Sequence, residues 1–525
     1  MHQNPRSTHN IEENKKSKEL NKLRDKSKHG GGKKRIQQQH EKGKLTARER
    51  IELLVDEGTF VEIDEFVTHQ NSKFNMAENK PLGDGVITGY ASISGRTTFL
   101  YSQDFTVFGG SLGKAQADKI CKVLDLAVKT GSPVIGLLDS GGARIQEGVD
   151  SLAGYGNIFY RNTQSSGVIP QISIILGPCA GGAVYSPALT DFILMSRSNA
   201  FMFVTGPEVV KAVTGEDVSF YELGGSEVHG SLTGISHLVG DTEEETIDLA
   251  KKLLSYLPQN NLDEPPIRFD DVIEIDQSDL VAIIPPAENE PYDMKRIIEI
   301  LTDAESFFEL QEEWAKNIVI GFARVGGSTV GIIANQPLYL GGAIDYHASD
   351  KASRLIRFCD SFNIPILTLV DVPGFMPGIK QEHEGIIRHG AKLLFAYSEA
   401  SVPKISLIVR KAYGGAYIVM SSKHLGTDIN LAWPSAEIAV MGSEGAVKIL
   451  HRKKLKEEKE PEKVLADFAQ KFKDEFANPY QAAERGYIDK VIHPEETRRE
   501  IVFALHLLQN KREQTPRRKH GISPV

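Results

Sequence analysis

Short apolar runs alternate with amphipathic stretches along much of the chain, most clearly in its second half. Residues 365–371 and 404–409 are continuous runs of apolar and β-branched residues, typical of strands covered on both faces of a sheet. Residues 385–400, between them, have the spacing of an amphipathic helix. Strand, helix and strand in this order predict parallel strands joined by right-handed crossovers, and therefore an α/β fold.

The two halves of the chain repeat each other. Residues 50–63 are echoed by residues 297–310, with a separation of 247 residues from Asp56 to Asp303. Further matches share a separation of 232 residues: Gly89 and Gly95 with Gly321 and Gly327, Gln103 with Asn335, Asp118-Lys119 with Asp350-Lys351, and Asp139 with Asp371. The repeat predicts two tandem domains of one fold that arose by internal duplication.

A segment rich in Pro, Asn and Asp, residues 258–271, separates the two copies and is the predicted linker. We therefore expect an N-terminal domain at 43–264 and a C-terminal domain at 272–518, preceded by an arm at 1–42. The length of 525 residues, too long for one ordinary hydrophobic core, agrees with two domains.

Net charge and hydropathy narrow the class of protein. The formal net charge of -9 and the pI near 6.0 argue against nucleic-acid binding as the main function. The sequence contains no run of 18 apolar residues, so it predicts no membrane-spanning helix. The start of the chain lacks the apolar core of a signal peptide, and Glu12, Glu13 and Glu19 disfavour a mitochondrial presequence. We expect a cytoplasmic protein with neither a membrane nor a nucleic-acid partner.

Two smaller features qualify this picture. Residues 15–50 are basic and poor in apolar residues before Leu45, which predicts an exposed helical arm. A non-enzymatic alternative is that this arm contacts RNA or a scaffold. The three cysteines, Cys121, Cys179 and Cys359, are far apart in apolar contexts, so we expect small buried residues rather than disulfides or a zinc site.

Two glycine-rich loops are suited to chemistry, and each occurs once in each half. The first follows a buried strand and reads Asp139-Ser140-Gly141-Gly142-Ala143-Arg144-Ile145-Gln146-Glu147-Gly148, answered by Asp371-Val372-Pro373-Gly374-Phe375. The second follows the next strand and reads Gly177-Pro178-Cys179-Ala180-Gly181-Gly182-Ala183, answered by Arg410-Lys411-Ala412-Tyr413-Gly414-Gly415-Ala416.

Glycine allows close backbone approach, and unpaired N–H groups at a strand-to-helix turn would stabilise a carbonyl oxygen that becomes anionic. Tight packing would explain one such turn. Two turns at matching points of a duplicated chain suggest two oxyanion sites and two carbonyl substrates.

Four motifs in this order resemble the β (carboxyltransferase) subunit of propionyl-CoA carboxylase and its relatives. They are the first-half loops, Asp371-Val372-Pro373-Gly374-Phe375, and Trp433-Pro434-Ser435-Ala436-Glu437-Ile438-Ala439-Val440-Met441-Gly442, and the similarity runs from about Lys44 to the C-terminus. The resemblance implies two crotonase-like (ββα-superhelix) domains, with an acyl-CoA site on the N-terminal one and a biotin site on the C-terminal one. It also implies a homo-hexamer whose active sites lie between the N domain of one subunit and the C domain of another.

The resemblance also implies roles for residues of the motifs. Gly181 and Gly182 would hold the thioester oxyanion, and Gly415 and Ala416 the ureido oxygen of biotin. Further substrate-binding positions would be Gly141, Gly142, Ala143, Arg144 and Ile418, and the biotin-side loops would include Pro373, Gly374, Phe375, Tyr413 and Gly414. Arg144 has two readings, because it could bind a CoA phosphate or pair with Glu147. Related enzymes vary between acidic and aliphatic residues at the position of Ile418, which affects acyl-chain preference.

The activity so implied is transfer of a carboxyl group from carboxybiotin to the α-carbon of a short-chain acyl-CoA. Propionyl-CoA, giving methylmalonyl-CoA, is the favoured substrate, and acetyl-CoA is a further one. The chain shows no biotin-accepting domain and no ATP-binding module, so biotin would be carried by a partner, the biotin carboxylase or biotin carboxyl carrier subunit. No His/Ser/Asp constellation or metal cluster recurs beside the loops, so we expect no metal in this subunit, and biotin itself would be the base. The protein would supply oxyanion holes and alignment.

Other functions remain open at this stage. A methylmalonyl-CoA or glutaconyl-CoA decarboxylase α subunit of a sodium-pumping complex would use the same site in the opposite direction. A CoA-dependent hydratase or isomerase would instead need acidic bases on one domain. The sequence leaves open the exact acyl-CoA, the direction of transfer, the identity of the biotin-bearing partner and the role of the arm.

Overall fold

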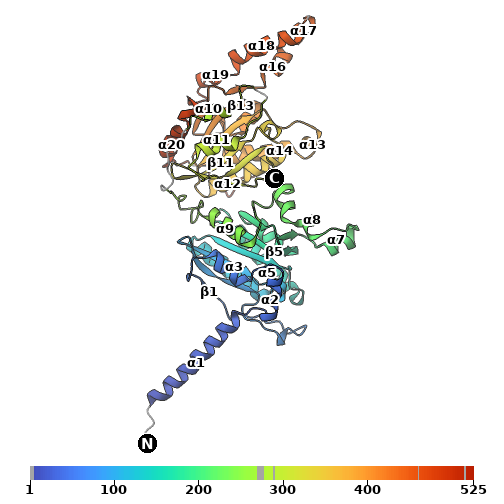
Figure 1. Ribbon diagram of the computed structural model, residues 1–525, viewed down its shortest axis with the longest axis vertical. Coiled ribbons are helices and arrows are strands. Elements are labelled where there is room, and N and C mark those ends of the chain that lie inside the picture. Colours follow the sequence, from blue (N-terminus) through green and yellow to red (C-terminus); the bar gives the residue numbers. More distant parts are fainter. Residues whose placement is uncertain (1–4, 269–276, 288–289, 459, 514–515) are drawn as a thin grey trace. The chain divides into compact units, whose positions relative to one another are not determined.

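The computed structural model describes residues 5–268, 277–287, 290–458, 460–513 and 516–525. The chain divides into two compact units, Met1–Asn261 and Leu262–Val525 (Figure 1). This division falls within the predicted linker at 258–271. Residues 269–271 of that linker, and the predicted start of the second domain at 272, lie outside the described residues.

Among the residues that the structure describes, each unit is built on one mixed sheet of eight strands. In the first unit the strand order is β1-β2-β3-β4-β5-β6-β8, with β7 paired to the end of β5. The pairs β1–β2 and β2–β3 are antiparallel, and the remaining pairs are parallel. The strands are β1 (Val61–Ile63), β2 (Val86–Ile93), β3 (Arg96–Gln103), β4 (Val134–Ser140), β5 (Gln171–Ala180), β6 (Phe192–Ser196), β7 (Phe201–Phe203) and β8 (Leu238–Gly240).

The second unit repeats this topology. Its order is β9-β10-β11-β12-β13-β14-β16, with β15 paired to the end of β13. The strands are β9 (Phe308–Leu310), β10 (Ile318–Val325), β11 (Ser328–Asn335), β12 (Ile366–Val372), β13 (Lys404–Tyr413), β14 (Ile429–Ala432), β15 (Glu437–Ala439) and β16 (Lys490–Val491). The predicted parallel strands at 365–371 and 404–409 are confirmed as β12 and β13, which pair in parallel.

Helices cover both faces of each sheet. Along β12, Leu367 and Leu369 belong to the core that contains α11 and α20, whereas the hydroxyl of Thr368 hydrogen-bonds that of Tyr397 on α14. In the first unit α4 packs with α5, and α3 packs with α9. These helices are α3 (Ala47–Leu54), α4 (Lys114–Thr130), α5 (Val149–Ser165), α9 (Glu243–Leu254), α11 (Met294–Leu301), α12 (Tyr346–Ser361), α14 (Ile386–Glu399) and α20 (Thr497–Leu508).

The remaining helices are shorter or lie outside these layers. They are α1 (Pro5–Ser27), α2 (Lys33–Glu41), α6 (Tyr185–Ala188), α7 (Pro207–Thr214), α8 (Phe220–Gly224), α10 (Leu280–Ile283), α13 (Ile379–His383), α15 (Gly414–Val419), α16 (Ser443–Leu450), α17 (Arg452–Glu457), α18 (Pro461–Phe476) and α19 (Pro479–Glu484). Between β7 and β8 the first unit carries α7 and α8, whereas the second unit carries α16 to α19 between β15 and β16. Within the described parts of the chain, none of the helices has the length and apolar character needed to span a bilayer.

The internal duplication is confirmed element by element. Helices α3 and α11 begin at Ala47 and Met294, which repeats the separation of 247 residues found in the sequence. Strands β4 and β12 begin at Val134 and Ile366, which repeats the separation of 232 residues. The three cysteines are free and buried, as predicted.

The prediction of an exposed helical arm as far as Arg50 fits α1 and most of α2, but it is wrong at Gln39 and from Lys44 to Arg50. Figure 1 shows α1 extending away from the sheet of its own unit, and its residues from Lys15 onward are mostly exposed. By contrast Gln39, Lys44 and Arg50 are buried. Their polar ends reach an acidic group inside the first unit, and that contact outweighs the hydrophilic character of the sequence.

The repeated lysines of the sequence are buried hydrogen-bond donors. Lys119 Nζ donates to Gly83 O at 3.0 Å and to Val86 O at 2.5 Å. Lys351 Nζ donates to Gln311 O, Trp314 O and Ile318 O at 2.7–2.9 Å. Burial lowers the pKa of Lys119 to about 8 and that of Lys351 to about 7. Each lysine therefore fastens the loop before the β2 or β10 hairpin to the following helix.

We expect Lys351→Met to destabilise the protein by about 3 kcal/mol or more, because each buried carbonyl left without a donor costs about 1–3 kcal/mol. Urea denaturation followed by fluorescence measures the shift. Lys114→Met is the control, since the side chain of Lys114 forms an exposed ion pair with Asp118, whose loss costs less than about 1 kcal/mol. Equal midpoints for the two variants would contradict the role given to Lys351.

Candidate active site

In both units the pairing of the two central parallel strands changes register just before the two glycine-rich loops that the sequence analysis identified. In the first unit Leu138 pairs with Ile175, and Ser140 then pairs with Cys179. In the second unit Val370 pairs with Ile408, and Val372 then pairs with Ala412. The bulge brings the ends of the two adjacent strands, and the loops that follow them, side by side.

In the first unit the residue at this bulge is Asp139, which is fully buried. Its Oδ2 accepts hydrogen bonds from Lys44 Nζ at 2.6 Å, Arg50 Nη1 at 2.9 Å and Gln39 Nε2 at 3.2 Å. Arg50 also pairs with Glu243. Burial lowers the pKa of Lys44, which Asp139 opposes, whereas for Arg50 the neighbouring carboxylates outweigh burial and raise the pKa. Arg50 therefore remains charged and balances two buried carboxylates.

In the second unit Asp371 occupies the same position with different partners. Its Oδ2 accepts from Tyr292 Oη at 2.8 Å and Arg410 Nε at 3.0 Å, and its Oδ1 accepts from the backbone N–H of Lys411 at 3.0 Å. Burial and the neighbouring carboxylate raise the pKa of Tyr292. The repeat places Pro178, which has no N–H, where the second unit has Lys411. The buried Asp139 Oδ1 has no hydrogen-bond partner among the described residues.

The predicted substrate loop of the first unit, Gly141 to Arg144, folds against the end of β5. Gly142 has a φ of 100°, and a Cβ atom on it would lie 2.9 Å from Ala180 O, so only glycine fits without strain. The Gly141 N–H donates to Gly109 O, and the Gly142 N–H to Ser140 Oγ. The structure thus brings this loop next to the turn that follows Ala180.

The buried side chain of Arg144 anchors this loop through ion pairs and a hydrogen bond. Its Nη1 contacts Asp84 Oδ1 at 2.7 Å and Glu147 Oε1 at 2.8 Å. Nη2 donates to Ser111 O at 3.0 Å. Burial raises the pKa of Asp84, which the contact with Arg144 opposes. Of the two readings of Arg144, this geometry favours the structural ion pair with Glu147.

The turn after β5 carries the predicted oxyanion residues of the first unit. Gly181 has a φ of 62°, and Gly181–Val184 form one turn of 3₁₀-helix whose first N–H groups have no acceptor within the helix. A Cβ atom on Gly182 would lie 3.1 Å from the ring of Tyr155 on α5. The turn is thus backed by a buried aromatic ring.

The second unit builds the equivalent loop from Pro373, Gly374 and Phe375. The backbone of Ile344 donates to Gly374 O at 3.1 Å, and Ile344 forms a parallel bridge with Phe375, just as Leu112 does with Ala143 in the first unit. The ring of Phe375 lies 2.9 Å from the position that a Cβ atom on Gly390 of α14 would take. This loop therefore rests on α14.

The turn after β13 runs from Tyr413 to Ala416. Gly414 has a φ of 59°, close to the value at Gly181. Apart from Gly415 itself, its chain neighbours and the backbone of its own helix, no described atom lies within 4 Å of the position that a Cβ atom on Gly415 would take. Ala416 is buried, whereas Ile418, on the same short helix, is 40% exposed. The turn is thus open beside Gly415, and Ile418 is exposed nearby on the same short helix.

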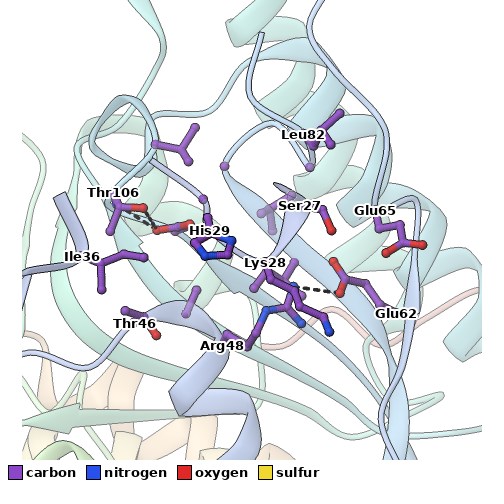
Figure 2. Close-up of a pocket in the computed structure, with 18 residues that line it drawn as sticks. Ser27, Lys28, His29, Ile36, Thr46, Arg48, Glu62, Glu65, Leu82 and Thr106 are labelled. Carbon is purple, nitrogen blue, oxygen red and sulfur yellow. Dashed lines mark hydrogen bonds and ion pairs between the residues drawn. The ribbon is translucent and has the colours of Figure 1, made fainter. Parts of the chain in front are cut away.

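A small cavity of the first unit lies apart from these loops. It has a volume of about 40 Å³ and lies between the end of α1 and strand β2, where Arg48 pairs with Glu62 at 2.9 Å (Figure 2). That volume holds a few water molecules at most. None of the predicted site residues lines it, so it is not part of the candidate active site.

Sequence reasoning missed the anchors of the loops. Lys44 and Arg50 fall within the stretch predicted to be exposed, although Arg50, Ile51 and Leu54 share one buried face of α3. Glu437 was noticed only as part of a motif, yet its buried carboxylate accepts a hydrogen bond from Tyr413 Oη. The apolar spacing of α3 was the one available signal for Arg50.

Comparisons with known proteins agree with this architecture. The carboxyl transferase domain family matches residues 38–523. The propionyl-CoA carboxylase carboxyltransferase subunit of Haloferax mediterranei is 57% identical over 509 residues, covering 97% of this chain and 98% of that protein. The methylmalonyl-CoA decarboxylase subunit alpha of Propionigenium modestum is 53% identical over 512 residues, covering 97% and 99%.

A solved structure of transcarboxylase 12S, described as a hexamer assembly with methylmalonyl-coenzyme A and methylmalonic acid bound, matches with a TM-score of 0.94. It is 48% identical, and the match covers 97% of this chain and 98% of that one. The predicted α/β fold of two tandem crotonase-like domains is confirmed. The chain belongs to the carboxyl transferase family of the acyl-CoA carboxylase β subunits, and it is an enzyme that acts as a carboxyltransferase.

Proposed function

We propose that the chain transfers a carboxyl group from carboxybiotin to the α-carbon of a short-chain acyl-CoA, with propionyl-CoA as the favoured substrate and acetyl-CoA as a further one. The observation that carries the proposal is the duplicated turn. Gly181 and Gly414, with φ values of 62° and 59°, directly follow the equivalent strands β5 and β13 in two copies of one fold. Two matching turns suit a reaction in which two carbonyl oxygens gain negative charge.

The turn of the first unit would hold the thioester. The N–H groups of Gly181 and Gly182 lie at the start of the 3₁₀-helix, where they have no acceptor within it, and the loop from Gly141 to Ala143 lies beside them. Burial raises the pKa of Tyr155, so its ring backs the turn as a neutral group. These residues would bind the thioester oxygen, stabilise the enolate that forms when the α-proton leaves, and orient the α-carbon.

The turn of the second unit would hold biotin, and its residues fit such a group. The open side of Gly415 leaves room for a ring above the backbone, and the N–H groups of Gly415 and Ala416 lie in the first turn of α15. Pro373, Gly374, Phe375 and Tyr413 would form the adjacent walls. Bound carboxybiotin would supply both the carboxyl group and the base, and the chain would hold the ureido oxygen in place.

We further propose a cytoplasmic homo-hexamer that works with a separate biotin carboxylase or biotin carboxyl carrier subunit. Support comes from the hexamer assembly described for transcarboxylase 12S. A duplicated chain with one substrate on each unit requires two units to face each other, which closed symmetry can provide between subunits.

A second candidate function is the same transfer in the opposite direction. The similarity to a methylmalonyl-CoA decarboxylase subunit favours it, at 53% identity. Purification of the native complex separates the two functions. Co-purification of an ATP-dependent biotin carboxylase supports carboxylation, and co-purification of a polytopic membrane subunit supports decarboxylation.

We expect Gly182→Val and Gly415→Val to impair different halves of the reaction. Gly182→Val should impair the half-reaction at acyl-CoA, and Gly415→Val the half-reaction at biotin. The assay is transfer from methylmalonyl-CoA to free biotin, and each variant should lose about 10² to 10³ in rate. Only Gly182→Val should also weaken binding of propionyl-CoA measured by calorimetry, because Gly415 lies on the biotin side. Wild-type transfer by both variants would refute the assignment of the two turns.

Substitution of Arg144 by Gln should lower activity equally with acyl-CoA and with an acyl-pantetheine that lacks the nucleotide phosphates. The reason is that the change leaves Asp84 and Glu147 without their buried partner and loosens the loop from Gly141 to Ala143. Steady-state kinetics with both substrates measure this. A loss seen only with acyl-CoA would restore the reading in which Arg144 binds a phosphate.

Ile418 should line the wall next to the acyl tail. One methylene in an apolar pocket discriminates by only about 1–3 kcal/mol, so the enzyme should accept acetyl-CoA, propionyl-CoA and butyryl-CoA without a sharp choice. Ile418→Asp should change the ratios of kcat/KM among the three substrates and leave the thermal midpoint nearly unchanged, because the side chain is 40% exposed. Identical ratios would make Ile418 a packing residue only.

The oligomeric state follows from the intersubunit site. Multi-angle light scattering of the purified chain, whose mass is 57.9 kDa, should give six times that mass. A monomer with full transfer activity would exclude a site shared between subunits.

A further inference from the structure

The two turns differ in the residue that precedes the first glycine. In the first unit this residue is Ala180, which has no polar side chain. In the second it is Tyr413, whose hydroxyl donates a hydrogen bond to Glu437 Oε2. Lys473 Nζ pairs with the other oxygen, Glu437 Oε1, at 2.6 Å. Tyr413, Glu437 and Lys473 thus form a chain of contacts, here called the tyrosine anchor, at the turn of the second unit.

The tyrosine anchor joins three separate segments. Tyr413 is the last residue of β13 and the N-cap of α15, directly before Gly414. Glu437 is the first residue of β15 and pairs with Lys411 of β13. Lys473 lies in the last turn of α18, one of the helices found only in the second unit. The position of the turn is therefore tied to the position of α18.

Burial makes the anchor a strong constraint. The Tyr413 residue is 8% exposed and the Glu437 side chain 5% exposed, while that of Lys473 is 28% exposed. A hydrogen bond to a buried charged group is worth about 1.5–3 kcal/mol, more than one between neutral groups. Removing one partner of a buried ion pair leaves the other charge without compensation.

The contact between Glu437 and Lys473 borders a cavity. This cavity of about 770 Å³ lies between α10 and the end of α18, and Glu437 and Lys473 both line it. The segment after β15 also touches the turn, because a Cβ atom on Gly414 would lie 3.0 Å from Val440 O. A shift of Glu437 would therefore move both the side chain of Tyr413 and the Val440 carbonyl group beside Gly414.

The turn of the first unit is supported in a different way. Strand β7 pairs with β5 as β15 pairs with β13, but β7 consists of Phe201, Met202 and Phe203 and carries no carboxylate. The turn there is backed by the ring of Tyr155 against Gly182. An apolar wall supports one turn, and a charged contact aligns the other.

We propose that Tyr413, Glu437 and Lys473 are positioning residues for the biotin half-reaction, because they fix the orientation of the Gly414–Gly415–Ala416 backbone towards the ureido oxygen. This inference rests on the proposed function of that turn. It gives α18 a role in catalysis through the contact between Lys473 and Glu437.

The test uses the full-length protein and transfer from methylmalonyl-CoA to free biotin. Tyr413→Phe removes only the hydroxyl and should raise the KM for biotin about ten-fold, with an unchanged KM for methylmalonyl-CoA. Glu437→Ala should have a larger effect, which Glu437→Gln, still able to accept from Tyr413, should partly reverse. Lys473→Met should shift the same parameter, and it supplies an independent reading if Tyr413→Phe folds poorly.

Tyr397→Phe is the matched control, because it removes a buried hydroxyl that bonds Thr368 and lies outside both turns. It should leave both KM values unchanged. The proposal is overturned if Tyr413→Phe and Lys473→Met change neither KM, or change both KM values equally. Gly415→Val separates the two levels. If it blocks transfer while the anchor variants behave like wild type, only the anchor fails, whereas unaltered transfer by Gly415→Val removes the proposed function and the anchor with it.

Discussion

A buried aspartate at the end of a central parallel strand is the constraint on which both halves of the molecule depend. A β-bulge lies at Asp139 and at Asp371, where the ends of two adjacent strands and the loops that follow them lie side by side, and both carboxylates are buried there. In the first unit a Cβ atom on Gly177 would overlap Asp139 Oδ1. Since an isolated buried charge is very costly, each bulge requires a cation close by.

The two units meet this requirement from different directions. Arg50 and Lys44 approach Asp139 from the segments before the sheet, whereas Arg410 approaches Asp371 from the neighbouring strand itself. The second unit also has a backbone donor at Lys411, where the first has Pro178. Duplication has thus kept the carboxylate and the bulge, which shape the loops, and has let the neutralising groups diverge. Divergence of the same kind at the turns gives Tyr155 behind one and Glu437 near the other.

Much of this architecture could be predicted from the sequence, because period and repetition survive without knowledge of contacts. The apolar runs predicted β12 and β13, and the separation of Asp139 from Asp371 predicted equivalent places in two copies of one fold. The glycines of the turns were found because positive φ and close backbone approach restrict the residue type. By contrast, the burial of Arg50 was not predicted, since a basic side chain in a polar stretch ordinarily faces water. Glu437 and Lys473 were not connected, because their contact joins segments far apart in the chain and lacks a counterpart in the repeat.

We infer that the two turns of the duplicated fold divide the substrates between them. The most direct measurement is an experimental structure of the assembled protein with propionyl-CoA and biotin bound together. We expect the thioester oxygen within hydrogen-bonding distance of the Gly181–Gly182 backbone, and the ureido oxygen within the same distance of the Gly415–Ala416 backbone. Both ligands on one unit, or a ureido oxygen held away from Gly415, would contradict this inference.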